Sequence, residues 1–223
     1  MTIRHHVSDE LLMDYAGGGL EEGWSLAVAT HLALCPHCRT RLRAMEATGG
    51  AMLEDIGDAV DDRADEASWN ALRSRLVDAP QQKPQSVARP ASMPEVSLVP
   101  EPLRSRLGGD LDGLQWRALG LGAYHYPVRT ADKTISVRLL RIPAGKPVPE
   151  HGHNGRELTL VLRGAFSDAQ DRFGPGDFEE TDETVNHQPV AEAGEDCICL
   201  AVTDAPLKFR SRLVRLIQPL IGI

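Results

Sequence analysis

Apolar positions in the first 80 residues recur at the three- and four-residue spacing of a helix. Ser8, followed by two acidic residues, is a suitable N-cap, and the glycine run 17–19 ends the first helical pattern. Pro36 separates two further helices, because proline disfavours helix in the preceding residue but suits the first turn of a new one. The pattern predicts helices from Ser8 to the glycines and over about 21–34, 36–56 and 65–77.

Behind residue 103 the pattern changes to short β-type runs bounded by turn residues, over 135–142, 158–162 and 196–203. Residues 79–102, between the two patterns, contain six prolines, no glycine and no aromatic residue, which favours an extended, semi-rigid linker. We therefore expect an α+β protein of two domains, a small all-α bundle over 1–78 and a β-barrel over 103–223.

The charge is unevenly placed. The chain has a net charge of −8, and residues 1–79 hold 7 basic against 14 acidic side chains. An acidic front disfavours direct nucleic-acid binding and favours a basic partner, for instance the DNA-binding face of another protein. Ordinary solubilising surface charge is the alternative interpretation.

No run of about 18 apolar residues and no signal-peptide core is present, which argues against a membrane anchor. The four cysteines do not resemble a secreted disulfide framework. We therefore expect a cytoplasmic protein. Cys197 and Cys199, two apart in an apolar run, are expected to be buried core thiols, with a redox role as the alternative.

A thiolate-rich metal site is indicated at the front of the chain. A helix places His31 and Cys35 on one face, and Cys38 returns to the same point after the proline break. Such ligands typically close around structural zinc. The fourth ligand must come from elsewhere: His6 is favoured, with His5 and His37 as competitors. The alternative is that both cysteines are core residues without metal.

The run Gly145-x5-His151-x-His153-x3-Glu157-x6-Gly164 matches the first cupin motif at every specified position. Residues two apart on a strand point to the same face, so His151 and His153 both enter the barrel, and Glu157 shares their parity. His187 is the best fourth ligand, although it follows Pro175-Gly176-Asp177 only after ten residues, a departure from the second cupin motif. Such cupins bind iron, manganese, nickel or zinc.

The pattern from His6 to Tyr15, followed by His31-x3-Cys35-x2-Cys38, resembles the zinc-binding anti-sigma domains of bacteria over residues 1–78. Together with the cupin motif, it makes the chain similar to the ChrR-type anti-sigma factors over nearly its whole length. The resemblance implies that His6, His31, Cys35 and Cys38 bind zinc. It also implies a cytoplasmic zinc protein that holds an extracytoplasmic-function sigma factor inactive until singlet oxygen or a related species acts on the cupin domain.

An enzyme is the alternative to this regulator. In that case the cupin barrel is a metal-dependent, dioxygenase-like catalyst and the helical domain only regulates it. The sequence shows no evident general base or substrate clamp beside the metal ligands. For the regulator we expect zinc at both sites, with iron, manganese or nickel as the alternatives in the barrel.

Overall fold

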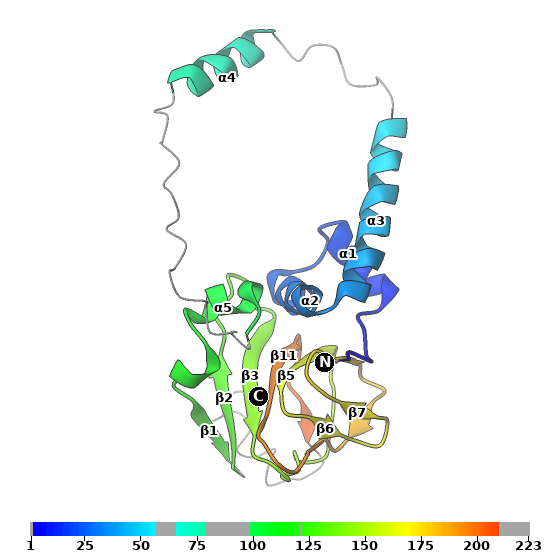
Figure 1. The fold of residues 1–223 in the computed structure, drawn as a ribbon, viewed down its shortest axis with the longest axis vertical. Helices are drawn as coiled ribbons and strands as arrows, with labels where there is room; N and C mark the ends of the chain where they lie inside the picture. Colours follow the sequence, from blue (N-terminus) through cyan, green and yellow to red (C-terminus); the bar gives the residue numbers. More distant parts are fainter. Residues whose placement is uncertain (1, 57–65, 79–98, 121, 210–223) are drawn as a thin grey trace. The chain divides into compact units, whose positions relative to one another are not determined.

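The computed structural model describes residues 2–56, 66–78, 99–120 and 122–209. Its helices are α1 (Asp9–Ala16), α2 (Glu22–Leu34), α3 (Pro36–Asp55), α4 (Glu66–Asp78) and α5 (Glu101–Leu107), and a 3-10 turn, Leu111–Gly113, follows (Figure 1). The four helices predicted at the front are confirmed to within one or two residues. The Ser8 hydroxyl caps α1 by accepting a hydrogen bond of 3.2 Å from the Leu11 amide, as its position predicts.

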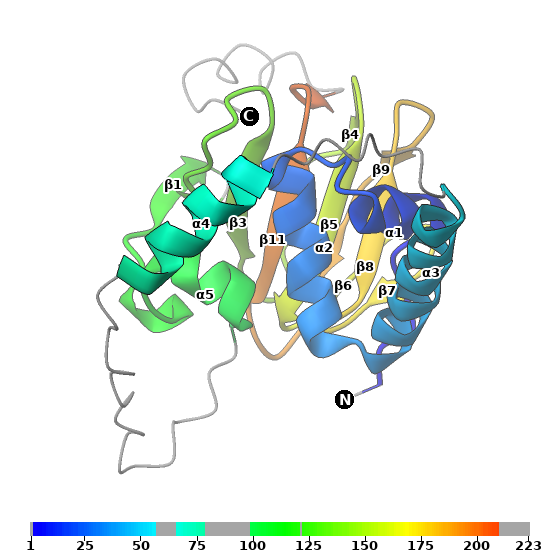
Figure 2. The same cartoon turned by 90° about the horizontal axis from the view of Figure 1, so that it is seen from above.

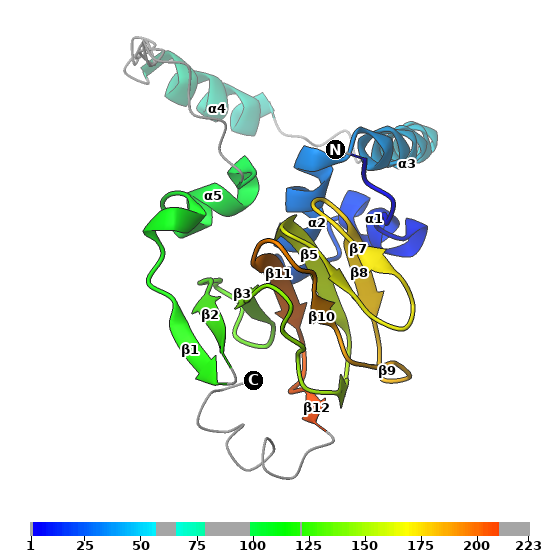
Figure 3. The same ribbon diagram turned by 60° about the horizontal axis from the view of Figure 1, so that its bottom comes forward.

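The second half of the chain is a barrel of short antiparallel strands (Figure 3). Its strands are β1 (Arg117–Gly120), β2 (Ala123–Pro127), β3 (Ser136–Ile142), β4 (His151–Gly152), β5 (Glu157–Arg163), β6 (Phe166–Ser167), β7 (Arg172–Phe173), β8 (Phe178–Thr181), β9 (Asn186–His187), β10 (Val190–Ala191), β11 (Cys197–Thr203) and β12 (Lys208–Phe209). They form sheets in the orders β1-β2-β3-β11-β5-β8, β10-β6-β7 and β12-β4-β9. The predicted α+β class is thereby confirmed.

The chain divides into two compact units, one of residues 1–46 with 97–223 and one of residues 47–96. The first helices therefore pack with the barrel. Most of the predicted linker, residues 79–98, lies outside the described residues. The last residues of the predicted linker are not an extended connection, because Val99 is buried in the core and α5 begins at Glu101. The proposed division into domains 1–78 and 103–223 stays a prediction.

Helix α2 lies across β5 and β11 (Figure 2). Both strands are buried on both faces: alternate residues such as Leu158, Leu160 and Leu200 join the core shared with the helices, while the others face the barrel interior. The double burial explains why both strands are so apolar. The close approach of α2 to the barrel also depends on Gly23, because a Cβ there would lie 2.4 Å from the Ile135 side chain.

The hairpin corner after β5 depends on Gly164, the last position of the cupin motif. Its φ of +67° falls in the left-handed region, and a Cβ would lie 2.5 Å from the Asp196 carbonyl oxygen. The motif glycine is thus a backbone requirement of the barrel. Among the described residues, no helix is long and apolar enough to span a bilayer.

Candidate metal centres

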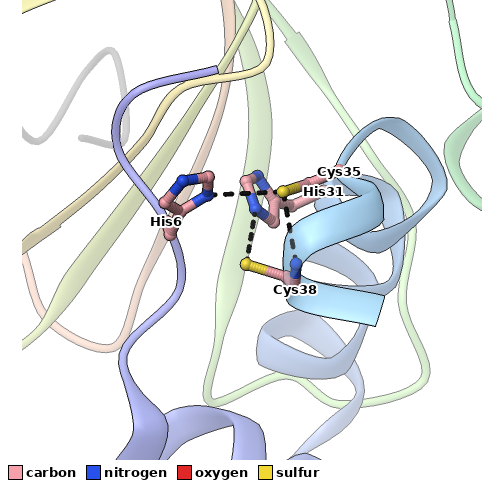
Figure 4. A group of neighbouring side chains, drawn as sticks. All are labelled: His6, His31, Cys35 and Cys38. Carbon is pink, nitrogen blue, oxygen red and sulfur yellow. Dashed lines mark hydrogen bonds between the residues drawn. The ribbon is translucent and has the colours of Figure 1, made fainter. Parts of the chain in front are cut away.

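The thiolate cluster gathers side chains from three segments. His6 lies in the N-terminal arm, which we define as residues 2–8 before α1. His31 lies in α2, Cys35 directly after α2, and Cys38 in the first turn of α3 (Figure 4). One ligand atom from each lies within 4.8 Å of the others. Cys35 Sγ is 3.3 Å from His6 Nδ1, and His31 Nε2 is 3.3 Å from Cys38 Sγ.

These separations suit a tetrahedral zinc ion. Ligand atoms at the usual Zn–N and Zn–S distances lie about 3.3 to 3.8 Å from one another. His31, Cys35 and Cys38 are buried and His6 is half-buried, which also fits a closed structural site. The residues present therefore fit the zinc that the sequence predicts, and they would supply two imidazole nitrogens and two thiolates to it.

The two competitors for the fourth position lie elsewhere. The His5 ring faces two carboxylates, with Nε2 3.0 Å from Asp171 and Nδ1 3.5 Å from Asp177. His37 is exposed, although its ring centroid is 4.6 Å from that of His6. The structure therefore groups His6, and neither competitor, with the thiolates. Its role as a ligand stays a proposal.

Burial sets the protonation states in the metal-free cluster. It lowers the pKa of His31 to about 4, so this imidazole is neutral at physiological pH. Burial, together with the neighbouring Cys35 thiol, raises the pKa of Cys38 to about 11. A bound cation reverses the preference of the thiol, because coordination deprotonates it. Metal binding at this cluster should consequently release protons.

The barrel site brings three predicted histidines together. His151 on β4 pairs directly with His187 on β9, which places both side chains on one side of the sheet. Their Nε2 atoms are 3.2 Å apart, and one ligand nitrogen from each of His151, His153 and His187 lies within 4.8 Å of the others. His153 Nε2 is buried without a hydrogen-bond partner in the described structure. An orphaned imidazole nitrogen in this group fits a metal ion.

Glu157, the fourth predicted barrel residue, lies beside the three histidines. Its Oε2 is 3.0 Å from His153 Nδ1, and the side chain is buried. As placed, the carboxylate orients His153. Coordination of a metal by Glu157 as well stays a proposal.

Two carboxylates that the sequence analysis missed also surround His187. Asp168 Oδ2 lies 2.8 Å from His187 Nδ1, and Glu179 Oε1 lies 3.6 Å from the same nitrogen. Burial, with the nearby charges of Asp168 and Glu157, raises the pKa of Glu179 to about 8. Neither carboxylate belongs to the cupin motif, so no spacing rule could have found them.

A cavity of about 70 Å³ adjoins the barrel site, and Glu157, Glu179, His151, His187, Cys197 and Cys199 are among its lining residues. Both cysteines are free and buried, as predicted. A hydrogen bond with Cys197 and burial raise the pKa of Cys199 above its ordinary value, which keeps this thiol protonated and poorly reactive. A larger depression of about 450 Å³ is bordered by His151, Glu150, Asn186 and Lys208.

The fold combines front helices that carry a His/Cys cluster able to hold a metal ion with a β-barrel that carries a second, histidine-rich cluster. The sequence profile of the ChrR cupin-like domain matches residues 104–206. Anti-sigma-E factor ChrR of Cereibacter sphaeroides is 48% identical over 223 residues, which is 100% of both sequences. The chain belongs to the ChrR family of anti-sigma factors.

A solved structure extends this similarity to three dimensions. It is the crystal structure of Rhodobacter sphaeroides SigE in complex with the anti-sigma ChrR. The match has a TM-score of 0.75 and 44% sequence identity, and it covers 91% of this chain and 99% of that one. The similarity thus includes both the helices and the barrel.

Proposed function

We propose that this chain is a cytoplasmic anti-sigma factor that sequesters an extracytoplasmic-function sigma factor. One observation carries the proposal: the chain is 48% identical to Anti-sigma-E factor ChrR along the complete length of both sequences. The relative of known structure was crystallised with SigE. Because the similarity runs through the helices, the part expected to bind the partner is included.

An exposed apolar surface supports a protein partner. Trp69, Leu76 and Val77 of α4 are 54%, 66% and 77% exposed, and Leu72 is 43% exposed. Met52 and Leu53 in the last turn of α3, and Ile56 directly after it, are each at least 65% exposed. Trp69, Leu72 and Leu76 are three and four residues apart and so share one face of α4, and an exposed apolar face of this kind often marks a binding surface. The acidic front adds attraction for a basic partner.

We further propose zinc at both clusters. At the front, His6, His31, Cys35 and Cys38 would hold it as a structural ion that joins the arm, α2 and α3. In the barrel, His151, His153 and His187, with Glu157 beside them, would hold a second metal. When bound, this second ion would hold the three imidazoles together, and oxidation at or near this site would change how the barrel packs against the helices.

Release of the partner would follow from a change at the barrel site, with singlet oxygen or a related oxidant as the signal. Contacts within the chain support such a link. The Arg4 and His5 amides donate to Asp177 at 2.6 and 3.0 Å, and the Ser8 amide donates to Glu180 at 2.7 Å. The arm that carries His6 is thus held by the barrel segment around β8.

The test uses the full chain and its candidate sigma factors. Trp69→Ala should weaken binding by roughly 30-fold or more if this side chain anchors the partner, while Val190→Ala, at an exposed position on the barrel, should leave it within threefold. Calorimetry or interferometry would measure both. A folded, zinc-loaded chain that captures no sigma factor contradicts the proposal. A complex that stays fully associated in singlet oxygen contradicts the signal alone.

The enzyme remains the second candidate, and one observation favours it. The depression beside His151 falls in the size range of small-molecule sites. Iron-loaded protein that consumes dioxygen with an added substrate would support this alternative. Stoichiometric zinc at both clusters, without oxygen consumption, would support the regulator.

A further inference from the structure

His187 is held at both ring nitrogens. Its Nε2 faces His151 Nε2 at 3.2 Å, toward the proposed metal, and its Nδ1 faces Asp168 Oδ2 at 2.8 Å. A carboxylate only accepts hydrogen bonds, so the contact places a proton on Nδ1. The Nε2 lone pair is then free to bind a cation. His187 thus has the tautomer that a metal ligand needs.

The Asp168 carboxylate is itself fixed by the turn that joins β6 to β7. Its Oδ1 accepts hydrogen bonds from the amides of Gln170 and Asp171, at 2.8 and 3.2 Å, and the Asp168 amide donates to the Asp171 carbonyl at 3.1 Å. One carboxylate oxygen therefore holds the turn and the other holds His187. The Asp168 side chain is fully buried, which shields this contact from water.

The other two histidines are held in the same manner. His151 Nδ1 lies 2.9 Å from the Pro149 carbonyl oxygen, and His153 Nδ1 lies 3.0 Å from Glu157. Each of the three rings thus has an oxygen acceptor at Nδ1. Because the acceptor for His187 comes from the hairpin of β6 and β7, that ring alone depends on a side chain outside the cupin motif.

We propose that Asp168 is the positioning residue for His187, and that it sets the affinity of the barrel site for its metal. This inference rests on the proposed barrel metal site and goes beyond it by assigning a residue outside both cupin motifs. An acceptor at the second nitrogen of a metal-bound histidine fixes the ring orientation and makes the other nitrogen more basic. Removing such a partner typically weakens metal binding about 10- to 100-fold.

Asp168→Asn separates the contact with His187 from the turn. Asparagine retains one oxygen acceptor and suits this kind of turn, so the amides of Gln170 and Asp171 stay satisfied. Its NH2 group then faces His187 Nδ1, and an amide NH2 group cannot accept a hydrogen bond from an Nδ1–H. The variant should keep the hairpin while favouring the wrong tautomer of His187.

Glu179→Gln provides the matched control. Glu179 is also buried and near His187, but its oxygen is 3.6 Å from Nδ1, too far for a hydrogen bond. The change from carboxylate to amide is the same in both variants. If any change from carboxyl to amide beside His187 weakens metal binding, the two variants should behave alike; if the contact with Nδ1 matters, only Asp168→Asn should weaken it.

The experiment measures Zn²⁺ retention by the full chain in competition with a chelator, followed by nitrogen NMR of the His187 ring. The unaltered chain should retain two zinc ions, His187→Ala one, and Asp168→Asn should release its second zinc at a 10- to 100-fold lower chelator concentration. Glu179→Gln should stay within threefold of the unaltered chain. In Asp168→Asn, the NMR signals should show a loss of the Nδ1–H tautomer, which a purely structural role would not produce.

Three results would overturn the inference. Equal zinc retention by Asp168→Asn and the unaltered chain, with His187→Ala still losing one ion, would show that His187 needs no positioning. An equal loss in Glu179→Gln would show that the contact with His187 Nδ1 is not what sets the affinity for the metal. An unaltered chain that holds a single zinc would remove the barrel site itself, whereas sigma-factor capture, measured separately, would still test the proposed function.

Discussion

His31 Nδ1 lies 3.0 Å from the carbonyl oxygen of Gly176, so a candidate zinc ligand in α2 is oriented by the barrel. A carbonyl oxygen only accepts, which places the proton on Nδ1 and leaves Nε2, 3.3 Å from Cys38 Sγ, for the metal. The His31 ring also meets Phe178 edge-on, with centroids 5.4 Å apart. The barrel therefore helps to set the geometry of the front cluster.

Loss of a front ligand should remove one zinc and destabilise the helices. In His31→Ala, zinc content should fall by one ion per chain, because a three-ligand site lacks a closed shell. Structural zinc provides on the order of 10 kcal/mol of apparent binding free energy, so the melting temperature should fall sharply. Elemental analysis and circular dichroism would measure both effects.

His37→Ala is the control for that variant. His37 lies near His6 but is exposed and outside the cluster. Zinc content and melting temperature should both stay unchanged. Loss of zinc from His37→Ala with retention in a His6→Ala variant would show that the fourth ligand has been misassigned.

Gly23→Ala should weaken the packing of α2 on the barrel. The added methyl would lie 2.4 Å from Ile135, and overpacking of this kind costs about 1 to 3 kcal/mol. Gly50→Ala in α3 is the matched change, because nothing lies within 4 Å of its Cβ position. It should be neutral or stabilising by up to about 1 kcal/mol, since alanine favours helix. Denaturant titrations of both variants would decide, and equal effects would contradict the contact.

Asp177 should stabilise the arm in a pH-dependent manner. Burial alone would raise its pKa, but the amides of His5, Gly174 and Arg4 outweigh burial and hold the pKa below the ordinary 3.8. A lowered carboxylate pKa gives stability that is present above about pH 3.8 and lost as the pH falls through the folded value. Asp177→Asn should therefore lower the melting temperature most at neutral pH, and the difference should shrink below pH 3.8. A difference constant from pH 7 to 3 would contradict this assignment.

Emptying the barrel site should loosen the arm, if the two sites are coupled. His151→Ala should accelerate hydrogen exchange at the amides of His5 and Phe178, which bond to Asp177 and to the His5 carbonyl. Coupling between sites is typically 5- to 150-fold, so an acceleration of about fivefold or more is expected. Amides of α4, in the other unit, serve as the reference. Unchanged exchange in the arm would refute the proposed link.

Much of this structure could be predicted from local sequence patterns. The spacing of His31, Cys35 and Cys38 lies within two helices and one proline break, so sequence distance translates directly into position. The same holds for His151 and His153 around β4. The bounds of α1 and the break between α2 and α3 were predictable because Ser8, the glycines 17–19 and Pro36 mark them.

Contacts set by long-range register were not predictable. Asp168 reaches His187 only because the hairpin of β6 and β7 folds toward β9, and no periodicity encodes that approach. The packing of α2 on β5 and β11 could not be predicted either, because no sequence periodicity encodes it. Helix α5 was missed because prolines at 100 and 102 resembled linker, although Pro102 suits a first helical turn.

Alternate residues of strand β8 point to opposite faces and contact different centres. Phe178 and Glu180 contact the helical side, at His31 and Ser8, while Glu179 and Thr181 face the barrel interior. Neighbouring substitutions on this strand would therefore disturb different centres, and a one-residue slip would exchange their surroundings. Substitutions at these four consecutive positions can thus perturb the His/Cys cluster and the barrel site separately in a chain of unaltered length. Truncation between the helices and the barrel cannot achieve this.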